Sequence, residues 1–107
     1  MDNGGLFLVL VDEGRVVGMG GIRRLEDDTC ELKRMWFLRE YRGQGLGRQM
    51  AQRLLDFAKQ QGYTRVRLDM VNTEVQAQAL RLYERLGFYF IEPYHDSSCA
   101  VFMEKVL

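Results

Sequence analysis

The sequence has few of the residues that build metal sites or disulfide frameworks. Its 107 residues include one histidine and two cysteines, Cys30 and Cys99, which lie far apart and form no Cys-x-x-Cys pair. Structural zinc sites need several such ligands at close spacings, so the sequence predicts no metal. No secretory signal indicates an oxidising compartment, so we expect two free thiols in a cytoplasmic protein.

Long apolar runs and an excess of one charge are also missing. No run approaches the roughly 20 apolar residues that cross a bilayer, which predicts no membrane partner. Fifteen Lys and Arg residues balance fifteen Asp and Glu residues. A neutral chain has no overall field to attract nucleic acid, so an anionic ligand must be held locally. The length fits one domain over residues 1–107.

What the sequence does contain predicts a mixed α/β fold. Apolar segments at 6–11, 15–25 and 29–38, separated by acidic turns, indicate an antiparallel meander. The first is continuously apolar and suits a buried strand. Glycines 18, 20 and 21 mark places where a partner backbone approaches or the second strand bends. In the third, alternation holds around Glu31 and Lys33 but residues 35–38 are all apolar, which indicates a bulge or a changed environment.

The second half of the sequence predicts a strand between two helices. Apolar residues recur every three or four positions over 45–61, which predicts an amphipathic helix that Gly62 ends. Alternation predicts a strand over 65–70, parallel to the third strand. A second helix reaches Gly87, followed by strands at 88–91 and 99–106.

A glycine-rich turn precedes the first helix and carries the strongest functional signal. It reads Arg42-Gly43-Gln44-Gly45-Leu46-Gly47. The glycines let the backbone approach a ligand, and a helix start offers N–H groups to a pyrophosphate. Arg48 replaces the lysine of a Walker loop and Met50 the last glycine of a dinucleotide fingerprint, which disfavours a nucleotide-binding switch. A tight turn that only starts a helix is the structural alternative.

These residues resemble the GNAT N-acetyltransferase motif Arg/Gln-x-x-Gly-x-Gly/Ala at Arg42, Gly45 and Gly47. Residues 79–88, Ala-Leu-Arg-Leu-Tyr-Glu-Arg-Leu-Gly-Phe, resemble the second signature of that family. The resemblance implies the GNAT fold, with acetyl-CoA as cosubstrate, a primary amine as acceptor and direct attack in a ternary complex. It also implies that the strands flanking the first helix splay apart to admit the cofactor. The cofactor residues implied are Met35 and Phe37 through their backbones, Arg42, Gly43, Gln44, Gly45, Leu46, Gly47, Arg48 and Gln76.

Two residues are carried over as catalytic. The resemblance implies that Glu31 accepts the proton of the acceptor amine and that Tyr83 protonates the leaving thiolate. A backbone N–H near Phe37 would stabilise the oxyanion. The structural alternatives are a strand glutamate paired with a basic neighbour and an aromatic residue in an apolar stripe. Gln76 stands where many relatives have asparagine.

The rest of the sequence leaves the acceptor open. Trp36 is expected in the core, and Tyr94, His95 and Asp96 in an exposed loop that could touch an acceptor. Arg23, Arg24, Lys33 and Arg34 are expected to form a solvated strand face. Many relatives begin with a strand and two helices that wall the acceptor site, so the domain is expected to be short at its N-terminus. A second subunit could supply that wall, which would make a homodimer. The alternative function is a non-catalytic acyl-CoA-binding module.

Overall fold

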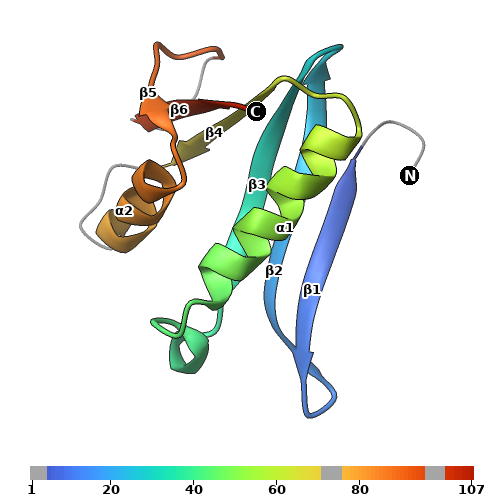
Figure 1. Ribbon diagram of the computed structural model, residues 1–107. Coiled ribbons are helices and arrows are strands. Elements are labelled where there is room, and N and C mark those ends of the chain that lie inside the picture. Colours follow the sequence, from blue (N-terminus) through green and yellow to red (C-terminus); the bar gives the residue numbers. More distant parts are fainter. Residues whose placement is uncertain (1–4, 71–75, 96–100) are drawn as a thin grey trace.

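The computed structural model describes residues 5–70, 76–95 and 101–107 and has the expected mixed α/β architecture (Figure 1). The strands form one sheet in the order β1-β2-β3-β4-β6-β5. β1 (Leu6–Asp12), β2 (Arg15–Glu26) and β3 (Thr29–Phe37) make the antiparallel meander, and β4 (Arg65–Met70) runs parallel to β3. β5 (Tyr89–Phe90) and β6 (Val101–Val106) complete it. The expected ends of β1 to β5 agree to within one residue, β6 ends at Val106 as expected, and residue 99, its expected start, lies outside the described ranges.

Two α-helices and one short 3-10 turn lie between the described strands. α1 (Leu46–Gln60) follows the turn η1 (Arg39–Tyr41) and precedes β4, and α2 (Ala77–Arg85) precedes β5. Gly62 and Gly87 end the helices with positive φ values of 92° and 99°, as expected for glycines after a helix. Within the described ranges, neither helix has the length and apolar character that crossing a membrane requires.

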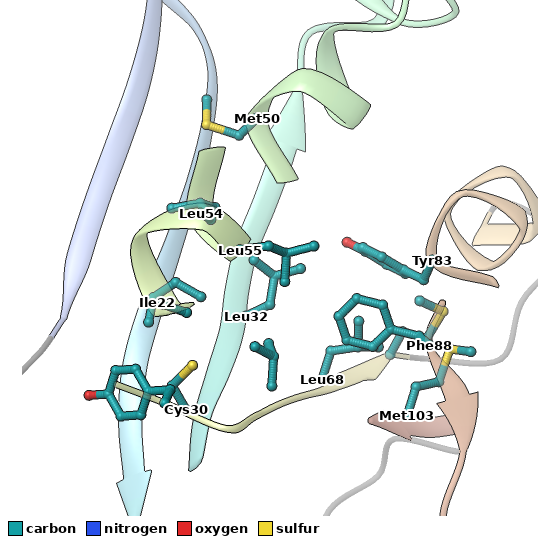
Figure 2. Packing of buried hydrophobic residues seen from close by; sticks show 14 of the residues in the cluster. Ile22, Cys30, Leu32, Met50, Leu54, Leu55, Leu68, Tyr83, Phe88 and Met103 are labelled. Carbon is teal, nitrogen blue, oxygen red and sulfur yellow. The ribbon is translucent and has the colours of Figure 1, made fainter. Parts of the chain in front are cut away.

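The two helices pack against one face of the sheet, which we call the helix face. The core lies between that face and the helices (Figure 2). Leu54 and Leu55 of α1 pack with Leu32 of β3, and Tyr83 of α2 joins the same cluster beside Leu68 of β4. Because strand side chains alternate, the polar residues of β3 and β4 point to the opposite side, which we call the outer face.

β1 is half exposed, so the expected buried strand was wrong. Leu6, Leu8 and Leu10 pack against the core, whereas Phe7 and Val9 are 46% and 49% exposed. β1 pairs only with β2, so it is an edge strand in the described sheet. An apolar run therefore cannot distinguish a buried strand from an edge strand with apolar residues on both faces.

A bulge in β3 explains the broken alternation. Met19 pairs with Trp36 and Gly21 with Lys33, so two residues of β3 lie opposite Gly20 alone, and Arg34 has a positive φ of 59°. The extra residue returns Met35 and Phe37 to the helix face. It turns Trp36 outward, where it is 42% exposed, so the expected core position was wrong.

Gly18 and Gly20 of β2 make room for side chains, whereas a Cβ at Gly21 would also meet the backbone oxygen of Leu6 at 3.3 Å. A Cβ at Gly18 would lie 2.4 Å from the ring of Phe37, and one at Gly20 would lie 2.5 Å from the sulfur of Met35. These two β3 side chains therefore lie directly over β2, between the strand and α1.

Candidate functional site: the start of α1 and the opening between β3 and β4

The opening lies where β3 and β4 separate. Their parallel pairing covers only Thr29–Arg65, Cys30–Val66 and Glu31–Arg67. Beyond that point β3 stays with β2 as far as Phe37, whereas β4 stays with β6 as far as Met70. Figure 1 shows the two strands diverging. The expectation that the strands flanking the first helix splay apart is confirmed.

The backbone of Phe37 faces this opening. Leu38 N donates to Val17 O at 2.9 Å, so residues 17 and 38 are a hydrogen-bonded pair. Because such pairs alternate along an antiparallel ladder, the N–H and C=O of Phe37 point away from β2. The carbonyl accepts a hydrogen bond from Arg42 Nε at 2.9 Å. The N–H remains on the side where an extended ligand arm would lie.

The start of α1 offers several N–H groups. The first helical bond runs from Gln49 N to Gly45 O, so the N–H groups of residues 46–48 have no acceptor within the helix. The N-cap, Gly45, adopts a left-handed φ of 81° and gives no side-chain cap, and the first turn has no acidic residue. A positive helix end without a carboxylate suits an anion.

The glycines keep the approach to these groups open. Gly43 and Gly45 have φ values of 78° and 81°, and a Cβ built at either would meet no atom within 4 Å. Gly47 lies in the helix beside Leu82 and Phe37. The exposed Arg42 and Arg48 flank the turn. Gln44 instead donates to Glu40 O at 2.9 Å, which leaves only its backbone at the turn. The residues present therefore fit a pyrophosphate.

Tyr83 reaches the opening from the helix face. Its ring packs edge-on against Phe88 at 5.6 Å, and in Figure 2 its hydroxyl points from α2 toward α1. Burial raises the pKa of Tyr83 to about 12. No described residue forms a hydrogen bond with its hydroxyl. Every fully buried side-chain nitrogen or oxygen atom among the described residues has a hydrogen-bond partner. The hydroxyl therefore lies at the edge of the core. Gln76 is the N-cap of α2 and is half-buried.

Glu31 lies on the outer face, at the last β3–β4 pair. Its side chain is only 1% exposed. One carboxylate oxygen pairs with Arg23 at 3.2 Å and Lys33 at 3.1 Å, and the other accepts the hydroxyl of Tyr94 at 2.6 Å. The basic residues Arg23 and Lys33 are thus partners of a buried acid as well as part of a strand face.

Tyr94 and His95 are not simply loop residues. Together with Asp69 and Glu31 they form a group that we call the Glu31 cluster. His95 Nε2 lies 2.5 Å from Asp69 Oδ2, and potential ligand atoms of Glu31, Asp69 and His95 lie within 4.8 Å of one another. We assign no metal here, because both Glu31 oxygens already have partners. Tyr94 is 63 residues from Glu31 in sequence, and no local pattern could have paired them. Asp96 lies outside the described ranges.

Comparison with known proteins gives the same family throughout. The model of the Acetyltransferase (GNAT) family matches residues 1–88. An uncharacterized N-acetyltransferase of Escherichia coli, YjgM, is 40% identical over 92 residues, which cover 83% of this chain and 54% of that protein. The chain thus spans about half the length of this relative.

Solved structures with the same fold include two acetyltransferases. The enzyme from Streptococcus agalactiae has a TM-score of 0.85 and 28% identity, with 99% of this chain and 69% of that chain covered. A GNAT family acetyltransferase from Elizabethkingia anophelis, solved with acetyl-CoA bound, has a TM-score of 0.79 and 18% identity, with 97% and 77% covered. At that identity the second shows the fold alone.

Proposed function

Because this chain belongs to the GNAT acetyltransferase family, we propose that it transfers the acetyl group of acetyl-CoA to a primary amine by direct attack in a ternary complex. The observation that carries the proposal is the uncapped start of α1 beside the opening between β3 and β4. We further propose that residues 1–107 are one N-acetyltransferase domain and that it acts in the cytoplasm, alone or as a homodimer.

The cofactor would be held mostly by backbone groups. The N–H groups of residues 46–48 would bind the pyrophosphate, with Gly43, Gly45 and the backbone of Gln44 allowing close approach and Arg42 and Arg48 adding charge. The arm would lie along β3 beside the backbones of Met35 and Phe37. Gln76, at the start of α2, would contribute its amide. The match to the Acetyltransferase (GNAT) family supports this choice of cosubstrate, and the Elizabethkingia anophelis acetyltransferase with the same fold was solved with acetyl-CoA bound.

The predicted acid and base approach the opening from opposite faces of the sheet. Tyr83 lies on the helix face and Glu31 on the outer face, so the two groups could serve different partners in direct attack, the thiolate that leaves and the amine that enters. Tyr83 would protonate the thiolate, since a pKa of about 12 keeps its hydroxyl protonated at neutral pH. Glu31 would take the amine proton, and a backbone N–H near Phe37 would stabilise the oxyanion.

Two measurements test the proposal. Titration with coenzyme A should show saturable binding to the folded chain, and acetyl-CoA should release free thiol when amines are added. The amines should include free amino acids, polyamines, antibiotic amines, and peptides with a lysine or a free N-terminus. Binding without turnover would support the alternative of an acyl-CoA-binding module. A folded chain that binds no coenzyme A at about 1 mM would contradict both functions.

A further inference from the structure

Glu31 is sealed by its own partners. At 1% exposure it has no free path to solvent, and each oxygen is covered: one by Arg23 and Lys33, the other by the hydroxyl of Tyr94. A buried carboxylate needs partners of this kind. An amine that binds on the outer face therefore meets one of these three side chains before it meets Glu31.

Only one of the three can pass a proton inward. The Lys33 ammonium and the Arg23 guanidinium are hydrogen-bond donors only and have no acceptor lone pair. A phenol both donates and accepts, so Tyr94 can take a proton on its oxygen while it gives its own to Glu31. Tyr94 is half-buried, with Glu31 on its inner side.

We propose that Tyr94 carries the proton of the acceptor ammonium to Glu31, an inference that rests on the acetyl transfer proposed above. The ammonium N–H bond breaks as its proton bonds to the Tyr94 oxygen, and the Tyr94 O–H bond breaks as that proton bonds to Glu31 Oε2. The nitrogen recovers its lone pair for attack on the thioester. Tyr94 is neutral before and after the transfer, and Glu31 gains one proton.

The surroundings keep Tyr94 in its protonated form. Burial, followed by the hydrogen bond to Glu31, raises the pKa of Tyr94 above its ordinary value. A phenolate there would stand 2.6 Å from a second negative oxygen. Tyr94 therefore serves as a relay and not as a phenolate base.

Three side chains hold the Tyr94 ring in place. The guanidinium of Arg67, on β4, lies 5.3 Å from the ring centroid. Phe102, on β6, and the adjacent His95 pack edge-on at 5.3 and 4.9 Å, and Asp69 holds His95. A relay needs this restraint, because proton transfer requires a hydrogen-bond geometry that does not drift. Among the residues with described positions, the charged or titratable groups around Tyr94 and Glu31 are Arg23, Lys33, Arg67, Asp69 and His95.

The chain contains a matched control for Tyr94. Tyr89 also donates to a buried glutamate, Glu104, at 2.6 Å. Tyr89→Phe and Tyr94→Phe each remove one phenol hydroxyl from one carboxylate. With the most active amine of the panel, Tyr94→Phe should lower kcat by about 10²-fold or more, and Tyr89→Phe should leave kcat unchanged. Acetyl-CoA affinity and the KM for acetyl-CoA should stay within about twofold of the parent in both.

The pH dependence separates a relay from a structural role. At a pH close to the pKa of the amine, much of the acceptor is already neutral, so the deficit of Tyr94→Phe in kcat/KM should shrink as the pH rises toward that value. A deficit caused by altered packing would not follow the basicity of the amine. With a less basic amine as acceptor, the deficit of Tyr94→Phe in kcat/KM should shrink at a lower pH.

The outcomes distinguish the relay from the function on which it rests. A parent that turns over while Tyr94→Phe matches Tyr89→Phe would overturn the relay and leave acetyl transfer standing. A parent that binds coenzyme A but acetylates no amine would overturn both. If Tyr94→Phe does not fold, 3-fluorotyrosine at position 94 keeps the ring and hydroxyl and lowers the phenol pKa. The relay predicts a changed kcat for this variant, and an unchanged kcat would contradict it.

Discussion

At the scale of single residues, Tyr83 combines burial with a hydroxyl that no described residue uses. We predict that Tyr83→Phe lowers kcat for acetyl transfer by at least about tenfold, because the leaving thiolate loses its proton donor. Acetyl-CoA affinity and the urea midpoint should change little, since the substitution removes no hydrogen bond to any residue that the structure describes. Thiol-release assays measure kcat, titration with coenzyme A measures the affinity, and urea unfolding measures the midpoint. Equal kcat values for variant and parent would remove Tyr83 from the acid role.

Cys30 makes a separate prediction about alkaline stability. Burial raises the pKa of its thiol to about 12 from 9.0, so the unfolded chain loses this proton at a lower pH than the folded one. Its contribution to stability is complete below about pH 9 and is lost as the pH rises toward 12. Between about pH 9 and pH 11 the free energy of unfolding should therefore fall more steeply in the parent than in Cys30→Ala. Urea unfolding under reducing conditions tests this, and parallel slopes would contradict it.

The residues of the site differ in how visible they are in the sequence. Tyr83, Arg42 and the glycines stand in local motifs whose spacing reveals them. Glu31 can be nominated the same way, and its pairing with a basic neighbour on the strand was one of the alternatives, which Lys33 fulfils. Its burial and its partners Arg23 and Tyr94 could not be predicted, because they come from β2 and from a loop 63 residues away. Asp69 is one polar residue on an alternating strand, and nothing nearby in the sequence distinguishes it from a solvated one.

At the scale of elements, the bulge in β3 shows how far a pattern reaches. The break in alternation is visible in the sequence, but which residue is the extra one depends on the pairing with β2. Arg34 takes that place, and it determines that Phe37 faces the core and Trp36 faces outward. The helices are more predictable because their periodicity and terminal glycines are local signals.

The start of α1 gives a prediction with an internal control. Gly45 and Gly62 precede and follow α1 with φ values of 81° and 92°, and a Cβ at either would meet nothing within 4 Å. Alanine at either should therefore cost a similar amount of stability, about 1–2 kcal/mol, from backbone strain alone. Only Gly45→Ala should also weaken coenzyme A binding, because its methyl group enters the space proposed for the pyrophosphate.

Calorimetric titration of both variants, at a temperature where each is folded, separates the two effects. A coenzyme A affinity that Gly45→Ala leaves unchanged from the parent would contradict a ligand at the start of α1. Equal loss of affinity in both would indicate that strain, and not contact, controls binding.

At the scale of the whole molecule, the sheet consists of two parts joined by a short seam. β3 and β4 share three residue pairs, whereas β4 and β6 share six. The order β1-β2-β3-β4 could be predicted from the meander and the strand–helix–strand unit, but the position of β6 between β4 and β5 could not. The length of the seam could not be predicted either. It is set by where the core residues of α1 and α2 hold the two parts, and those contacts join residues far apart in the sequence.

A ligand in the opening should join the two parts, and amide hydrogen exchange can detect it. The N–H groups of residues 46–48 and of Phe37 have no strand or helix acceptor, so they exchange without global unfolding and report local contact. We predict that saturating coenzyme A slows exchange at these amides. Exchange in the exposed edge strand β1 should slow only because the whole fold is stabilised. That stabilisation is about 2.7 kcal/mol when coenzyme A is in hundredfold excess over its Kd. Slowing of β1 with no change at residues 46–48 would mean that coenzyme A stabilises the chain from another site.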